Sequence, residues 1–205
     1  PSAEYRKQLV IKSVGGEGLD KVTLQAARRL PGDREWAVVT EAGERHARAS
    51  ESGGAPDRWL PKSCFVRGVS SAAVQAIAGG WRNGRIALSQ PAQSDLSFDP
   101  ETEADRLIEW LRPLWPADAP APTRLVRGVA IWTDQKWPWL SILSLSSLSA
   151  LEERIGHPLG LHRWRGNLWV EGWAPFAERE LIGRIIRIGA TELRVTDTIA
   201  RCDAT

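Results

Sequence analysis

The residue best suited to covalent or metal chemistry is Cys202, which directly follows Arg201. A neighbouring guanidinium favours the thiolate form of a cysteine, and the thiolate is both the nucleophile and the metal ligand. The other cysteine, Cys64, lies in a different sequence context and is expected to be structural. No disulfide between the two is expected in a reducing compartment. Cys202 is therefore a candidate reactive residue or metal ligand, with a small buried hydrophobe as the plain alternative.

Other common catalytic and binding motifs are absent. The sequence has no Gly-Lys-Ser/Thr at P-loop spacing and no Gly-x-Ser-x-Gly. Its three histidines share no metal-ligand spacing, and the two cysteines do not form a Cys-x-x-Cys pair, which argues against a zinc site. The 11 tryptophans could stack on bases or sugars. No basic run accompanies them, so we expect them to fill the core and edges of a β-rich domain.

Composition and charge narrow the class of protein. With 42% hydrophobic and 25% charged residues, the 205-residue chain has the balance of an ordinary globular domain. The net charge of +2 gives no sign of a nucleic-acid-binding arm. The uncharged stretch 137–151 is too short and too rich in serine to span a bilayer, and no secretory segment is visible. We therefore expect a cytoplasmic protein that binds neither nucleic acid nor membrane.

A set of short motifs follows one another in a characteristic order along the chain. They are Ile11-Lys12-Ser13, Asp33-Arg34-Glu35-Trp36-Ala37-Val38, Leu143-Ser144-Leu145-Ser146-Ser147-Leu148, Trp164-Arg165-Gly166-Asn167-Leu168-Trp169-Val170, Pro175-Phe176-Ala177-Glu178, Ile188-Gly189 and Arg201-Cys202-Asp203-Ala204-Thr205. In this order they resemble the MOSC domain family, named after the C-terminal domain of molybdenum cofactor sulfurases. The resemblance extends over nearly the whole chain and is similar in layout to bacterial proteins of the amidoxime-reducing component type.

The resemblance implies a site for molybdenum cofactor. Cys202 matches the family cysteine that ligates molybdenum or carries sulfur, and a soft thiolate suits that metal. Lysine, arginine and hydroxyl side chains suit the phosphate monoester and polar pterin of molybdopterin. The residues that match the pterin- and phosphate-binding positions of the family are Lys12, Ser13, Arg34, Ser144, Arg165 and Asn167.

The function implied is that of an oxidoreductase that reduces N-hydroxylated or related small molecules at a cysteine-ligated molybdenum. Its partners would be a small-molecule substrate and an external electron donor. One alternative is a sulfur-carrier or cofactor-carrier module that holds a persulfide on Cys202 and exchanges sulfur or cofactor with a donor protein. Another is a non-catalytic module that binds an anionic or aromatic ligand. Without the resemblance, Lys12 could be a surface lysine at a strand end, and Arg165 and Asn167 could cap a turn.

The elements that must position these residues are mostly strands. Alternating apolar and polar residues, bounded by residues typical of turns, predict strands at 5–12, 19–25, 35–40, 85–89, 96–98, 124–131, 167–171, 184–188 and 192–196. Helical periodicity and capping signals predict helices at 70–78, 100–114 and 146–155, and 41–57 reads as a loop. The fold class expected is α+β and mainly β. It would be a MOSC-type β-barrel with an N-terminal β-barrel-like portion and a few short helices.

The same pattern predicts two portions. Residues 1–123 would form an N-terminal MOSC-like β-rich portion. Residues 124–205 would form the MOSC core that carries the cysteine motif, without the closing segment that follows the cysteine in the family.

Overall fold

The computed structural model describes residues 2–52, 55–56, 58–128, 132–134 and 136–200. Strands outnumber helices, and the helices are short, which confirms an α+β fold that is mainly β. The described strands form sheets of two to four strands, and no closed barrel is found among them. No helix in this part of the chain has the length and apolar character needed to cross a membrane.

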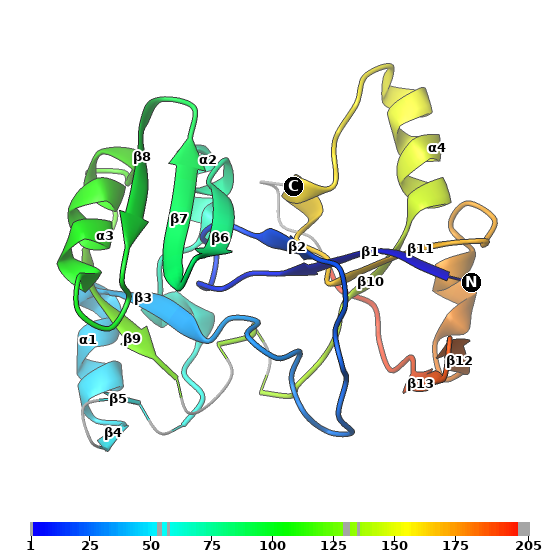
Figure 1. Ribbon diagram of the computed structural model, residues 1–205, viewed down its shortest axis with the longest axis horizontal. Helices are drawn as coiled ribbons and strands as arrows, with labels where there is room; N and C mark the ends of the chain where they lie inside the picture. The colour runs from blue at the N-terminus through cyan, green and yellow to red at the C-terminus, as the bar shows by residue number, and fades with distance from the viewer. Residues whose placement is uncertain (1, 53–54, 57, 129–131, 135, 201–205) are drawn as a thin grey trace.

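The central sheet joins the beginning of the chain to its last third. Its strand order is β10 (Ile142–Ser144), β11 (Leu168–Glu171), β1 (Ser2–Gln8) and β2 (Glu17–Leu19). β10 and β11 are parallel, whereas β1 is antiparallel to both of its neighbours. In Figure 1 the dark blue β1 and β2 run between the two ends of the molecule. The predicted boundary between the portions 1–123 and 124–205 stays a prediction.

At one end of the molecule, a three-stranded antiparallel meander packs beside α3 (Figure 1). It consists of β6 (Ala78–Arg82), β7 (Arg85–Gln90) and β8 (Gln93–Phe98). The β7–β8 hairpin was predicted, but β6 was not. The predicted helix at 70–78 is limited to α2 (Ala72–Gln75), which Ser71 caps by accepting a hydrogen bond from the Val74 N–H.

The helix α3 (Ala104–Leu111) forms because its apolar residues share one face. Leu107, Ile108 and Leu111 are buried there. They join the larger of two core clusters, to which β3, β7 and β8 contribute Val38, Ile86 and Phe98.

A two-stranded sheet lies beside α1. It pairs β3 (Trp36–Thr40) with β9 (Pro122–Arg127), and every residue of β3 is buried. The loop expected at 41–57 is wrong, because Glu41–Arg48 forms the helix α1. Gly43 lets this helix approach the backbone next to Cys64, where an added Cβ would meet the carbonyl oxygen of that residue at 2.2 Å.

At the other end of the molecule lie α4 (Leu145–Ile155) and a hairpin of β12 (Ile185–Ile188) and β13 (Thr191–Arg194), both close to prediction. Gly156 ends α4 in the left-handed conformation, with φ of 85°. The remaining elements are β4 (Glu51–Ser52), β5 (Ala55–Pro56), η1 (Lys62–Cys64), η2 (Gly68–Ser70), η3 (Arg112–Leu114), η4 (His162–Trp164) and η5 (Ala177–Leu181).

Candidate functional site

Lys12 lies in a tight turn after β1 and its side chain is buried. The turn is closed by a bridge between Ile11 and Val14, and Ser13 at its corner has a left-handed φ of 65°. The Lys12 ammonium donates to the carbonyl oxygen of Trp132 at 2.7 Å and to Asp134 Oδ1 at 2.5 Å. Burial lowers its pKa to about 8, although Asp134 opposes that change. The alternative of a surface lysine is therefore wrong for Lys12.

Arg34 lies in the loop before β3. Its backbone is left-handed, with φ of 50°, and its guanidinium pairs with the buried Asp33. The other oxygen of that carboxylate accepts the Leu9 N–H at 2.9 Å, which ties the loop to the chain after β1. The charge of Arg34 lowers the pKa of both Lys7 and Lys12. Arg34 is thus close enough to both ammonium groups to act on their charge states.

Arg165 reaches the same region from the opposite end of the sequence. It follows η4, has a left-handed φ of 50°, and its guanidinium lies close to Gly68. Its charge lowers the pKa of Lys7 and of His162. Three cations that the sequence placed on separate motifs therefore lie in one part of the fold.

The structure adds two residues that sequence reasoning missed. Lys7, on β1, has its Nζ 2.8 Å from His162 Nδ1, across 155 sequence positions. We call Lys7, Lys12, Arg34 and Arg165 the cationic cluster. The one signal that could have marked Lys7 was its position just before the buried apolar run Leu9-Val10-Ile11. His162 had no such signal.

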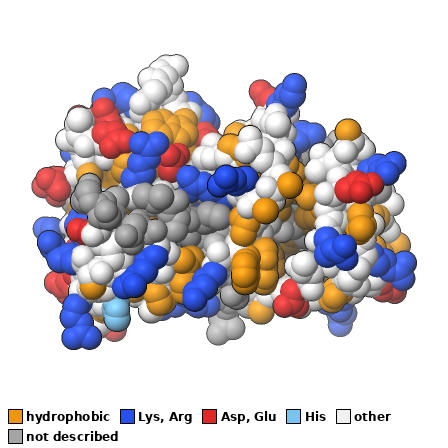
Figure 2. All heavy atoms as spheres, turned by 90° about the horizontal axis from the view of Figure 1, so that it is seen from below, with side chains coloured by type: hydrophobic (Ala, Val, Ile, Leu, Met, Phe, Trp, Pro, Cys, Tyr) orange, Lys and Arg blue, Asp and Glu red, His pale blue; other side chains and the backbone are white. Residues whose placement is uncertain are grey.

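The cationic cluster contains ammonium groups with and without a bonded carboxylate. Asp33 pairs with Arg34 and Asp134 pairs with Lys12, whereas no carboxylate is bonded to Lys7 among the described residues. By contrast, the basic side chains on the face shown in Figure 2 are scattered among acidic and apolar ones. The buried ammonium groups of Lys7 and Lys12, together with the guanidinium groups of Arg34 and Arg165, favour a multiply charged anion such as a phosphate monoester.

Asn167 has a structural role in the central sheet. Its side-chain Oδ1 accepts from the N–H of Ser141 at 3.2 Å and from the Ser141 hydroxyl at 2.9 Å. Its Nδ2 donates to the carbonyl oxygen of Lys7 at 3.2 Å. Asn167 thus holds β1 in place beside the cationic cluster through bonds that use both ends of its amide.

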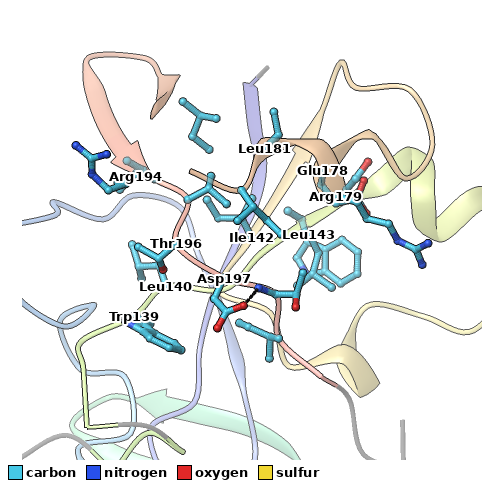
Figure 3. Close-up of a pocket in the computed structure, with 18 of the residues that line it drawn as sticks. Trp139, Leu140, Ile142, Leu143, Glu178, Arg179, Leu181, Arg194, Thr196 and Asp197 are labelled. Carbon is cyan, nitrogen blue, oxygen red and sulfur yellow. Dashed lines mark hydrogen bonds between the residues drawn. The ribbon is translucent and has the colours of Figure 1, made fainter. Parts of the chain in front are cut away.

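Ser144 lies apart from the cationic cluster, on a cavity of about 920 Å³. Apolar and aromatic side chains dominate its lining, and Ile142, Leu143 and Leu181 lie near its centre in Figure 3. Charged side chains such as Arg179 and Arg194 lie at its edge. Lys12, Arg34 and Arg165 do not line this cavity. The predicted site residues therefore divide between two places.

The Ser144 hydroxyl caps α4 by accepting the Ser147 N–H at 3.3 Å. We expect Ser144→Ala to lower the free energy of unfolding by about 1 kcal/mol, the usual loss for an N-cap serine. Ser149→Ala, on the exposed side of the same helix, is the matched control and should change it by less than about 0.5 kcal/mol. Urea unfolding measures both, and equal effects of the two substitutions would contradict the capping role.

Neither cysteine belongs to a metal site in the part of the chain that the structure describes. Cys64 is buried in the smaller core cluster, beside the Phe65 and Trp132 rings, and burial raises the pKa of its thiol. Cys202 lies outside the described residues. Within the described part of the chain, no group of three or more His, Cys, Asp or Glu side chains could hold a metal ion.

Comparison with known families bears on the last third of the chain. Residues 139–205 match the MOSC domain family model. No curated protein matches the sequence. The MOSC match contains Ser144, Arg165, Asn167 and Cys202, while Lys12 and Arg34 lie before it. MOSC domains are associated with molybdenum cofactor binding, and the predicted resemblance to the amidoxime-reducing component has no homologue to support it.

Proposed function

We propose that this protein binds molybdenum cofactor and reduces N-hydroxylated or related small molecules with electrons from an external donor. The observation that carries the proposal is that Arg165, which belongs to the MOSC match, and Arg34, which precedes it, both lower the pKa of the buried Lys7, while Arg34 also lowers that of Lys12. The buried ammonium groups of Lys7 and Lys12 and the guanidinium groups of Arg34 and Arg165 suit the phosphate monoester of molybdopterin. Cys202 is the proposed molybdenum ligand.

In this proposal, each residue of the cationic cluster has a separate task. Arg34 and Arg165 offer bidentate N–H donors to phosphate oxygens, and Lys12 adds a point charge. Asp33 and Asp134 hold Arg34 and Lys12 in place through their ion pairs. Asn167 keeps β1 in register beside them. The cofactor, when bound, supplies the two-electron chemistry that converts an N-hydroxyl group and two protons into an N–H group and water.

The test is metal analysis of the full chain purified from a host that makes molybdenum cofactor. We expect near-stoichiometric molybdenum in the wild type, and a loss of more than about tenfold in Cys202→Ser and in the double variant Arg34→Met/Arg165→Met. Cys64→Ala is the matched control, because it removes the buried cysteine and should leave the metal content unchanged.

The outcomes separate the candidate functions. Molybdenum that depends on Cys202, with reduction of a benzamidoxime probe by a chemical electron donor, supports the oxidoreductase. Molybdenum without turnover, or a persulfide on Cys202 detected by mass spectrometry, would instead favour a carrier of cofactor or sulfur. No metal in any variant would overturn the proposal.

A further inference from the structure

We propose that Lys7 is the specificity-determining charge of the anion site and that His162 positions it, so that the site prefers doubly charged phosphate esters to singly charged anions. This inference rests on the proposed function in one respect, namely that the cationic cluster binds an anion. It assigns a role to two residues that belong to none of the predicted motifs. Lys7 acts through its charge rather than through contact, because only 2% of the residue is exposed.

The position of Lys7 is fixed by the sheet and by a glycine. Its backbone N–H donates to the Asn167 carbonyl oxygen at 2.7 Å on one side, and it pairs with Gly18 of β2 on the other. Its side chain lies against Gly16, where an added Cβ would come within 2.4 Å of Lys7 Cε. The ammonium group is therefore held at one place within the protein.

The hydrogen bonds of His162 define its tautomer. Its Nε2 lies 3.2 Å from the carbonyl oxygen of Gln75, which can only accept, so Nε2 carries the proton. Nδ1 is then the acceptor for the Lys7 ammonium at 2.8 Å. Burial, Lys7 and Arg165 all lower the pKa of His162, so the imidazole stays neutral at neutral pH. The pair carries one positive charge, and that charge is on Lys7.

Lys7 differs from Lys12 and Arg34 in its partners. Each of those two has a carboxylate, whereas no carboxylate is bonded to Lys7 among the described residues. The charged groups that act on it are Arg165 and Arg34, which both repel it.

The acidic group closest in the sheet is Glu17 of β2, and its carboxylate is already engaged. It accepts from the Gln8 amide at 2.6 Å and pairs with Arg82 at 3.3 Å. Burial and the two arginines lower the Lys7 pKa to about 8. A buried cation without a countercharge is unfavourable, and a bound anion would supply that countercharge.

The charge of the bound anion distinguishes an electrostatic role of Lys7 in binding from a role in stabilising the fold. Phenyl phosphate carries two negative charges at neutral pH and phenyl sulfate carries one, with the same ring and nearly the same shape. A Coulombic contribution from Lys7 therefore counts twice for the first anion and once for the second. For Lys7→Met at pH 7, we expect the affinity to fall by about tenfold for phenyl sulfate and by about a hundredfold for phenyl phosphate.

The experiment is isothermal titration calorimetry of the full chain with both probes. Lys7→Met keeps the length of the side chain, and Lys21→Met removes an exposed lysine as the matched control. His162→Gln tests the positioning role. We expect it to lower the affinity for phenyl phosphate less than Lys7→Met does. Titration near pH 8.5 in two buffers with different ionisation enthalpies gives the protons taken up on binding. The wild type should take up protons and Lys7→Met should take up fewer.

The results separate this inference from the proposed function. A preference for phenyl phosphate that collapses in Lys7→Met but not in Lys21→Met supports the role of Lys7. Equal losses for the two anions, or unchanged proton uptake, overturn that role and leave anion binding intact. If the wild type binds neither probe, the anion site itself fails, and this inference fails with it.

Discussion

Between pH 7 and pH 10.5 we expect the unfolding free energy of the wild type to rise by about 3 kcal/mol relative to that of Lys7→Met. The reason is that folding lowers the Lys7 pKa from its usual 10.5 to about 8, mainly through burial, and each pKa unit corresponds to about 1.4 kcal/mol. Below pH 8 both states hold the proton, and the folded state carries the full penalty of a buried charge. As the pH rises, the folded state loses the proton first, so the penalty disappears by the pH at which the unfolded chain also titrates.

Urea unfolding of both proteins at half-unit pH intervals measures this difference. Subtracting the variant removes the contribution of Lys12, whose pKa is also lowered to about 8 and which both proteins share. The loss of the donor to His162 Nδ1 occurs only in the variant and adds a constant offset, which does not affect the change of the difference with pH. The curve of unfolding free energy against pH for Lys21→Met should run parallel to that of the wild type across the whole range. Parallel curves for Lys7→Met as well would show that the buried ammonium is not destabilised.

Asn167→Ala is expected to lower the free energy of unfolding by about 3 kcal/mol. The substitution removes an acceptor for the Ser141 N–H and hydroxyl and the donor to the Lys7 carbonyl oxygen, all of them buried. The usual loss is about 1 kcal/mol for each bond, and more where a buried group is left without a partner. Thermal or urea unfolding of the protein without added ligand measures the effect.

Ser141→Ala gives the matched comparison for Asn167. It removes the bonds made by the Ser141 hydroxyl and leaves the Ser141 N–H bond to Asn167 in place, so it should cause about half of the loss or less. A large effect of Asn167→Ala in the absence of ligand supports a structural role for this residue. If Asn167→Ala unfolds like the wild type and only weakens anion binding, the role in cofactor binding predicted from its motif is the better explanation.

Local signals in the sequence were sufficient for the parts of the fold that local interactions determine. The helix α4 and the β7–β8 and β12–β13 hairpins were all placed close to their observed positions. The helix α1 was missed because it contains Gly43 and has few apolar residues. It is stabilised by tertiary contacts, including those of Glu44 with Thr123 and Arg124, which no window of sequence contains.

In the candidate site, too, contacts between distant parts of the chain could not be predicted from local sequence. Lys12, Arg34 and Arg165 were chosen by resemblance to a family, and neither periodicity nor spacing could predict that their charges act on common neighbours. The contact between Lys7 and His162 joins residues 155 positions apart, so neither residue carries a local sign of the other. Asn167 was selected for its motif, but its hydrogen bonds follow from the register of β1 against β11.

The pairing of β1 with β11 also bears on how the protein is made. Ser2 lies opposite Glu171, and the neighbour of β11 on its other side, β10, begins at Ile142. During synthesis, β1 and its neighbour β2 therefore leave the ribosome long before β11, the other partner of β1, exists. Pairings over such sequence separations fold slowly, because a large loop must close before the contacts form. Arg165 joins Lys7 only when nearly the whole chain has been translated, so the anion site assembles late in folding.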